Sequence, residues 1–383
     1  MSVKVLSLFD GMACGMLAMK EAGIAVERYV AYEIDEYAVA TVKDNFPIVE
    51  ECGDVFKADF KQYAGFDFLI GGSPCTYWSV AQRKDKRETE AHGIGWQLFQ
   101  QYVRALHEAK PKYFIYENNK SMSKEVRDSI TKAFGFEPVY INSGLFTAQN
   151  RQRLYWVGKC TATGEYERVE LLDIEDKGIL IKDILDDTLT AEEHELVANE
   201  ELLQRAIHKS DASQYDKLAI VSKGFFSKGA KTKYIGSTSP ERAQGYRVYD
   251  AAGKSSCIRG QAHDRCCELW LLPLDSKPNT IIPYGRSKHG TLLWAWHVKT
   301  GLRHRVYMVK NGYIQINRRK HKVNVADGYY IISKPLMSEL RRLQGVPDWY
   351  SFEKAGNAQA CKLMGNGWTI PLISHLIKSC KAS

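Results

Sequence analysis

Four side chains in the first 160 residues have the types and positions that covalent catalysis requires. Cys75 follows an apolar run, 66–70, and a short loop with two glycines and a proline, and Glu117 follows a second apolar run. Arg151 and Arg153 precede a third. Such runs predict buried strands that open into loops, and open α/β sheets bind ligands at the carboxyl ends of their strands. We therefore expect a nucleophile, a carboxyl and two guanidinium groups to meet at one sheet edge, as in an enzyme.

The sequence around Cys75 favours a reactive thiol over a packing residue. Most lone cysteines are small buried hydrophobes. Pro74 and the flanking glycines instead predict a thiol exposed beside a helix N-terminus, where the thiol pKa is lowered. Glu117 alone is equally consistent with a helix cap. Arg151 and Arg153 alternate along an incipient strand, so both are expected to face one side.

A glycine-rich turn follows the first predicted strand. Residues 9–15, Phe-Asp-Gly-Met-Ala-Cys-Gly, precede a helix whose N-terminus offers free N–H groups to a ligand. The turn lacks the Gly-x-Gly-x-x-Gly pattern of dinucleotide sites and the lysine of a phosphate loop. Glu33 ends the second predicted strand, where a carboxylate binds ribose hydroxyls, and Asp54 follows the third, where it could accept from an adenine amino group. These residues predict an adenosyl ligand without a triphosphate.

Alternating strands and helices must position these side chains. The predicted strands are 3–9, 29–34, 66–70, 113–116, 139–142 and 154–157, and the predicted helices are 13–21, 36–44, 96–109 and 124–134. This alternation predicts an α/β fold with a doubly wound, mostly parallel sheet. From about residue 175, glycine-, lysine- and aromatic-rich segments predict a smaller, irregular, strand-rich domain. Helical periodicity returns at 335–343 and 370–377.

The composition, 44% hydrophobic and 26% charged over 383 residues, is that of a globular protein. No apolar run approaches the length of a membrane span, and the chain begins in a predicted strand without a signal peptide. Nine scattered cysteines without Cys-x-x-Cys spacing indicate free thiols in a reducing compartment. A cytoplasmic location is therefore predicted.

Positive charge is concentrated in one region. Residues 205–334 carry 24 basic and 8 acidic side chains, although the net charge of the whole chain is +8. A solvated surface would explain any one cluster. The uneven distribution and the interleaved aromatic residues favour a polyanionic partner, with nucleic acid as the natural candidate. The basic residues concerned include Lys228, Lys231, Lys233, Arg318, Arg319, Lys320 and Lys322.

In their order, these motifs resemble those of the DNA (cytosine-5)-methyltransferase family over the first 160 and the last 50 residues. The matching segments are residues 9–15 (cofactor), Pro74-Cys75 (nucleophile), Glu117-Asn118 (base-binding carboxyl), Gln149-x-Arg151-x-Arg153 (arginine motif), 342–348 (support of a recognition domain) and Gly365-Asn366-Gly367-Trp368 (closing cofactor motif). Thr76 and Asn119 depart from the commonest pattern, which has Gln and Val there. The first and last of these motifs resemble the phage-type and de novo branches.

The resemblance implies a class I S-adenosylmethionine-dependent methyltransferase fold. It implies a catalytic domain of residues 1–175 and 355–383 and a target-recognition domain of residues 176–354. The implied cofactor-binding residues are Phe9, Asp10, Gly11, Gly15, Glu33, Ile34, Asp54, Val55, Pro74, Leu98, Asn366 and Trp368. The implied partner is double-stranded DNA bound by a monomer.

The resemblance also assigns catalytic roles. Cys75 would add to ring carbon 6 of a cytosine flipped out of the duplex. Glu117, with its pKa raised by burial, would donate to ring nitrogen 3. Arg153 would hold the ring carbonyl oxygen, and Arg151 would support the nucleophile loop or a phosphate. The segment 76–95 would close over the base as a mobile loop.

Other hypotheses remain open at this stage. A tRNA-modifying branch shares these motifs, although the long recognition region favours duplex DNA. A catalytically inactive DNA-binding homologue would not need Cys75, Glu117 and Arg153 together. Metal binding through Cys257, His263, Cys266 and Cys267 fits no common zinc spacing, so no metal is expected. The target DNA sequence cannot be predicted from these residues.

Overall fold

The structure is a computed structural model that describes residues 2–79, 83, 85–209, 234–237, 247–258, 269–316 and 319–383. Part of the predicted basic surface and of the zinc hypothesis lies outside these residues, namely Lys228, Lys231, Lys233, Arg318, His263, Cys266 and Cys267. No helix in the part of the chain that the structure describes is long and apolar enough to cross a membrane.

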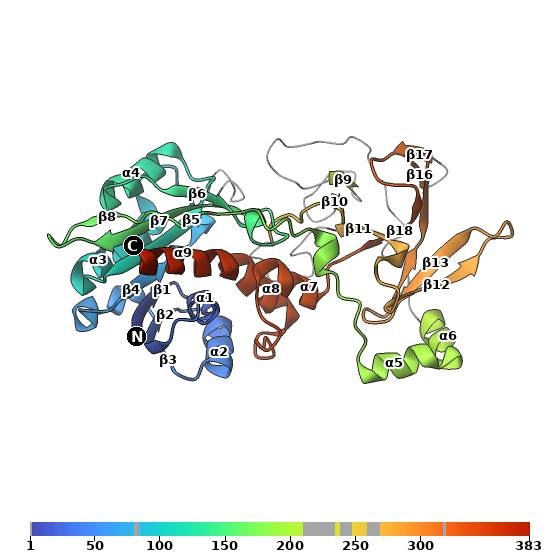
Figure 1. The fold of residues 1–383 in the computed structure, drawn as a ribbon, viewed down its shortest axis with the longest axis horizontal. Helices are drawn as coiled ribbons and strands as arrows, with labels where there is room; N and C mark the ends of the chain where they lie inside the picture. The colour runs from blue at the N-terminus through green and yellow to red at the C-terminus, as the bar shows by residue number, and fades with distance from the viewer. Residues whose placement is uncertain are drawn as a thin grey trace.

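One large sheet organises the N-terminal half of the chain (Figure 1). Its strand order is β3-β2-β1-β4-β5-β7-β6, with β8 beside β7, and β7 runs antiparallel to its neighbours. The strands are β1 (Val3–Leu8), β2 (Val26–Tyr32), β3 (Val49–Glu51), β4 (Phe68–Gly71), β5 (Tyr113–Asn119), β6 (Val139–Asn142), β7 (Gln152–Cys160) and β8 (Tyr166–Arg168). The predicted doubly wound, mostly parallel sheet is confirmed.

Helices cover both faces of this sheet, which is why its central strands are almost continuously apolar. One face packs against α3 (Gly93–Ala109) and α4 (Lys124–Phe134). The other packs against α1 (Cys14–Glu21), α2 (Glu36–Asn45) and α9 (Ile370–Ala382). The ends of the chain therefore meet in one core, because α9 lies against α1.

The second part of the chain is strand-rich, as predicted. A seven-stranded sheet has the order β17-β16-β15-β18-β11-β10-β9, and a second sheet has the order β12-β13-β14. The strands are β9 (Tyr234–Ser237), β10 (Arg247–Asp250), β11 (Leu269–Pro273), β12 (Ile281–Arg286), β13 (Leu292–His297), β14 (Leu302–Arg305), β15 (Tyr307–Lys310), β16 (Tyr313–Ile316), β17 (Arg319–Lys322) and β18 (Gly328–Ser333). The exact domain boundaries stay a prediction.

Two helices in this part were not predicted. They are α5 (Ala191–Ala198) and α6 (Glu200–Lys209), which follow one another directly. Leu203 of α6 forms a small apolar cluster with Trp296 and Val298, at and just after the end of β13. Short helices of this kind depend on tertiary packing rather than on a long periodic pattern.

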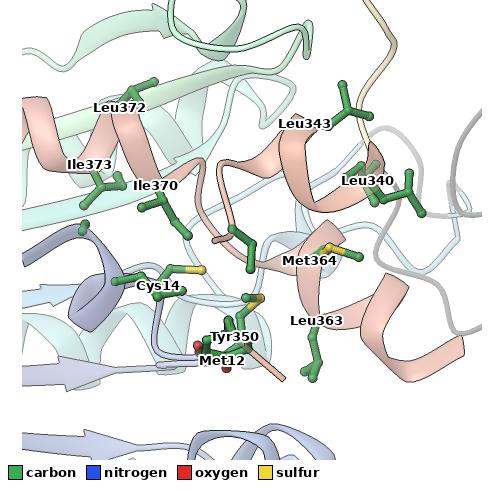
Figure 2. Packing of buried hydrophobic residues seen from close by; sticks show 14 of the residues in the cluster. Met12, Cys14, Leu340, Leu343, Tyr350, Leu363, Met364, Ile370, Leu372 and Ile373 are labelled. Carbon is green, nitrogen blue, oxygen red and sulfur yellow. Dashed lines mark hydrogen bonds between the residues drawn. The ribbon is translucent and has the colours of Figure 1, made fainter. Parts of the chain in front are cut away.

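Helices α7 (Met337–Gln344) and α8 (Gly356–Asn366) lie between the two parts (Figure 1). Their apolar side chains share a core cluster with the first turn of the chain and with α9, as Figure 2 shows for Leu343, Met364 and Met12. Tyr350 joins this cluster, and its hydroxyl donates to the Met12 carbonyl (2.8 Å). The C-terminal segment therefore fixes the turn that follows β1.

Candidate active site

A single cavity brings together side chains from the carboxyl ends of β1, β2, β4 and β5, from the start of β7, and from the chain around the end of α8. The sequence-predicted residues that line it are Phe9, Asp10, Gly11, Gly15, Glu33, Pro74, Cys75, Glu117, Arg151, Arg153, Asn366 and Trp368. Nucleophile and cofactor motifs thus open into one space.

The Cys75 loop is held by the polar end of the neighbouring strand β5. Cys75 is half-buried and begins a 3₁₀ turn, Cys75–Tyr77. The Asn118 side-chain amide donates to the Ser73 carbonyl (3.0 Å), and the Asn119 amide donates to the Cys75 carbonyl (3.3 Å). Asn119, which departs from the commonest family pattern, therefore helps to hold the loop that carries the predicted nucleophile.

The Cys75 thiol has a raised pKa, contrary to the predicted lowering. Burial raises it most, the Arg153 guanidinium lowers it, and the Glu117 carboxyl raises it again. The 3₁₀ turn has three residues and offers little of the helix-terminal field on which the prediction rested. At neutral pH the resting thiol is protonated, so a proton must leave before or during attack.

Glu117 is buried and engaged through both carboxylate oxygens. Oε1 lies 3.0 Å from Nε of Arg153, and Oε2 accepts a hydrogen bond from the Trp368 indole N–H (3.1 Å). Gly72 makes this close approach of strands possible, since a Cβ there would lie 2.4 Å from the Glu117 carbonyl oxygen. The carboxyl is therefore fixed in orientation beside the nucleophile loop.

Arg151 makes contacts that the sequence did not predict. Its guanidinium donates to the carbonyls of Gly365 and Gly367 (2.9 Å each), where Gln344 also donates to Gly367 (2.8 Å). Arg151 thus anchors the end of α8 and the residue that follows it. Its support of the nucleophile loop or of a phosphate stays a prediction. The predicted glycine loop is itself partly helical, since Gly365 and Asn366 end α8.

A strained turn and a carboxylate shape the other half of the cavity. Phe9 (φ 58°) and Gly11 (φ 61°) take left-handed backbone conformations. Glu33 Oε2 accepts the Gly11 N–H (2.8 Å), and Oε1 accepts the N–H groups of Ile34 and Asp35 (2.7 and 2.8 Å). These bonds hold the Glu33 carboxylate at the cavity wall.

Asp10 lines this cavity and carries one unpaired carboxylate oxygen. Its Oδ1 accepts from the hydroxyls of Ser7 (2.5 Å) and Tyr29 (2.6 Å), whereas Oδ2 is buried without a hydrogen-bond partner among the described residues. Burial raises the pKa of Asp10 to about 6, and the nearby Glu33 carboxylate also raises it. A buried acceptor of this kind fits a donor or cationic group on a ligand.

Four predicted cofactor residues do not line the cavity. Asp54 instead caps a 3₁₀ turn by accepting the Phe56 N–H (3.0 Å), and Val55 is buried. Ile34 is 75% exposed, and Leu98 packs on the core around α3. Their contact with a cofactor stays a prediction.

Ten further residues line the cavity, and the sequence analysis did not name them as site residues: Ser7, Cys14, Asp35, Ala38, Gly71, Gly72, Ser73, Thr76, Leu363 and Gly367. Of these, Cys14 and Gly367 lie within the predicted cofactor motifs and Thr76 follows Cys75. Asp35 is the N-cap of α2, a recognisable signal, and its carboxylate pairs with Lys362 of α8 (2.5 Å). Burial alone would raise the pKa of Asp35, but the Lys362 ammonium lowers it below its usual value. Residues 327 positions apart give no local sign of such a pair.

Glu88 connects the described part of the predicted loop 76–95 to its two ends by hydrogen bonds. The Glu88 carboxylate accepts the Gly95 N–H (3.1 Å) at the start of α3, and the Glu88 N–H donates to the Tyr77 carbonyl (2.8 Å). Val80, Ala81, Gln82 and Lys84 lie outside the described residues. Closure of the loop 76–95 over a base stays a prediction.

The fold is that of the class I methyltransferases. One similar solved structure is the Entamoeba histolytica methyltransferase EhMeth, with a TM-score of 0.56 and 11% identity over 100% of this chain and 98% of that chain. Another is a prophage-encoded E. coli protein described as a putative DNA modification methyltransferase, with a TM-score of 0.55 and 17% identity over 100% of this chain and 99% of that chain. At these identities the likeness concerns the fold alone.

The family model for C-5 cytosine-specific DNA methylases matches residues 3–382, and the chain belongs to this family. Relatives include the orphan methyltransferase M.SPRI of Bacillus phage SPR (36% identity over 169 residues, 41% of this chain and 37% of the relative) and the type II methyltransferase M1.ScrFI of Lactococcus lactis subsp. cremoris (31% over 169 residues, 40% and 41%). Each match spans about two-fifths of the relative's own length.

Proposed function

We propose that this chain is an S-adenosylmethionine-dependent DNA (cytosine-5)-methyltransferase that acts on double-stranded DNA. The observation that carries the proposal is that Cys75, Glu117 and Arg153 line one cavity, with Glu117 and Arg153 paired at 3.0 Å. Membership of the family supports this chemistry. Relatives named as phage orphan and type II methyltransferases favour DNA over tRNA as the substrate.

The chemistry follows from the weak nucleophilicity of ring carbon 5 of cytosine. The Cys75 thiol gives up its proton, and its sulfur adds to ring carbon 6, so the electron pair of the 5,6 double bond moves into the ring. Glu117 holds a proton at ring nitrogen 3, and Arg153 donates to the ring carbonyl oxygen, which stabilises the added charge. Carbon 5 would then form its bond to the methyl group while the sulfonium–methyl bond of the donor breaks. A base such as water removes the carbon 5 proton, which re-forms the 5,6 double bond and expels the Cys75 sulfur.

The residues present fit S-adenosylmethionine, which supplies an electrophilic methyl group when bound. The buried, unpaired Oδ2 of Asp10 is suited to a cationic group, and the Glu33 carboxylate to ribose hydroxyls. Trp368 and Gly11 line the same space.

The target base must leave the duplex to reach Cys75, because its ring atoms are inaccessible within the stack. The strand-rich part supplies positive charge for the DNA backbone. Of its predicted contacts, Lys320 and Lys322 are exposed on β17. Phosphate contacts of this kind give a salt-dependent affinity. A monomer in the cytoplasm is also expected and stays a prediction.

The test uses trapping of the covalent adduct. Duplex DNA with fluorine at cytosine carbon 5 should give an adduct that survives denaturant with the wild type, and none with Cys75→Ala, which should still bind DNA. Cys52→Ala, at an exposed free cysteine, is the control and should behave as wild type. An active Cys75→Ala variant, or an adduct on tRNA but not on duplex DNA, would overturn the proposal.

A further inference from the structure

Trp368 touches both halves of the cavity. Its backbone N–H donates to the Cys14 sulfur (3.3 Å), at the first residue of α1 beside the cofactor turn. Its indole N–H donates to Glu117 Oε2 (3.1 Å), the carboxyl assigned to the base. One residue therefore connects the proposed cofactor site to the proposed base site.

We propose that Trp368 is a positioning residue for Glu117, in which the indole N–H fixes one carboxylate oxygen and so presents the carboxyl to the target base in a single orientation. This inference rests on the proposed function. It goes beyond the cofactor contact expected of Trp368 from the sequence.

Two donors are needed because a carboxylate turns easily about its terminal bond, for which rotamer wells are broad. Arg153 holds Oε1 from the β7 side, and Trp368 holds Oε2 from the segment that follows α8. Each oxygen keeps lone-pair capacity for a further bond. The carboxyl is thus oriented before a base arrives, which removes a reorganisation cost from the reaction.

The Trp368 backbone is itself held on both sides. The Gly367 carbonyl accepts from Arg151 (2.9 Å) and Gln344 (2.8 Å), and the buried Thr369 hydroxyl donates to the Ser143 hydroxyl (2.8 Å). A Cβ at Gly367 would lie 2.8 Å from the Cys14 sulfur, so the chain is pressed closely against α1. An indole on this anchored segment can define a position rather than follow Glu117.

The test compares two substitutions that each replace the two-ring indole with a single aromatic ring. In Trp368→His, the imidazole Nε2–H can take the place of the indole N–H, and assays at pH 8 keep the ring neutral. Trp368→Phe keeps an aromatic ring and lacks the donor. Trp349→Phe is the control, at a tryptophan that is 47% exposed and outside the cavity.

Loss of a hydrogen bond to a carboxylate should lower kcat roughly 10-fold in Trp368→Phe, with the S-adenosylmethionine Kd and the DNA KM changed less than about 3-fold. Trp368→His should recover most of kcat. The same ranking should appear in the rate of adduct formation on fluorocytosine DNA. In a Glu117→Gln background, Trp368→Phe should slow adduct formation less than in the wild type.

Three results would overturn the proposal. Trp368→Phe could raise only the S-adenosylmethionine Kd, or Trp368→His and Trp368→Phe could lower kcat equally. The third is an effect of Trp368→Phe on adduct formation that is the same in the Glu117→Gln background as in the wild type. Should Trp368→Phe not fold, the comparison of Trp368→His with wild type decides, because a near-normal kcat is required there. A wild type that forms no adduct would instead refute the proposed function.

Discussion

The ion pair between Lys277 and Glu339 should be a major determinant of stability. Both side chains are fully buried, and they join the strand-rich part to the first turn of α7. Removing one partner of a buried pair leaves an uncompensated charge and costs about 3–5 kcal/mol. In Lys277→Met, Glu339 keeps backbone N–H donors from Asp186 (3.0 Å) and Leu336 (2.7 Å), so we expect the lower end, about 3 kcal/mol.

Glu339→Gln tests the pair from the other side. It leaves the Lys277 ammonium buried without its carboxylate, so it should also destabilise the fold. The double variant with Lys277→Met carries neither charge, and the glutamine oxygen can still accept a backbone N–H. The loss in the double variant should therefore be at least 1 kcal/mol smaller than the sum of the two single losses, as expected of residues in contact.

The measurement is the free energy of unfolding in urea, followed by circular dichroism, with the midpoint and slope compared across variants. Arg28→Met is the control, because the Arg28–Glu50 pair is solvent-exposed and should contribute less than about 1 kcal/mol. A Lys277→Met protein within 0.5 kcal/mol of wild type, or two additive single losses, would show that the pair contributes nothing specific.

Three further predictions concern the cavity. Asn119→Ala should slow adduct formation on fluorocytosine DNA about 2- to 10-fold without weakening DNA binding, and an unchanged rate would show that the bond to the Cys75 carbonyl is not needed. Because burial raises the Cys75 pKa, the adduct rate should still rise with pH above 7, and a plateau there would contradict a protonated resting thiol. Asp10 has a folded-state pKa of about 6, above its ordinary value, so the folded state binds its proton more tightly and stability falls as pH rises from about 4 through 6. Asp10→Asn should therefore raise the melting temperature at pH 8 and not at pH 4, and it should weaken S-adenosylmethionine binding. Equal melting temperatures of the variant and the wild type at pH 8 would refute the raised pKa of Asp10.

The central sheet could be predicted because its signals are local. Buried parallel strands give short apolar runs, and each run here ends at a turn residue. Helix α3 was expected from residue 96 and begins at Gly93. Gly93 and Gly95 suggest a loop, but the Glu88 carboxylate accepts the Gly95 N–H and stabilises the extra turn.

Helix α8 was missed for a related reason. Its sequence, Gly-Asn-Ala-Gln-Ala-Cys-Lys-Leu-Met-Gly-Asn, begins and ends with poor helix formers and has little apolar periodicity. Leu363 and Met364 are buried against the cluster that contains Met12 and Tyr350 (Figure 2). Tertiary packing, which the local sequence does not report, therefore determines this helix.

The kinds of residue in the site were predictable, whereas their partners were not. Arg151 was expected near the nucleophile or a phosphate, and it contacts carbonyls 214 and 216 residues further along the chain. The pKa of Cys75 was misjudged for the same reason, since the burial that raises it comes from segments brought together by folding.

Two neutral N–H donors lie against the proposed catalytic pair, Cys75 and Glu117. Asn119, at a position where the commonest family pattern has Val, donates to the carbonyl of Cys75, and Trp368 donates to the carboxylate of Glu117. One donor is a side-chain amide N–H and the other an indole N–H, and both come from neighbouring segments. Neither group needs to change its protonation state in order to act. Because an apolar side chain such as valine at position 119 could make no such bond, the geometry of the proposed site depends on fixed neutral donors around Cys75 and Glu117. Loss of either donor should therefore lower the rate of the chemical step more than the affinity for DNA or cofactor.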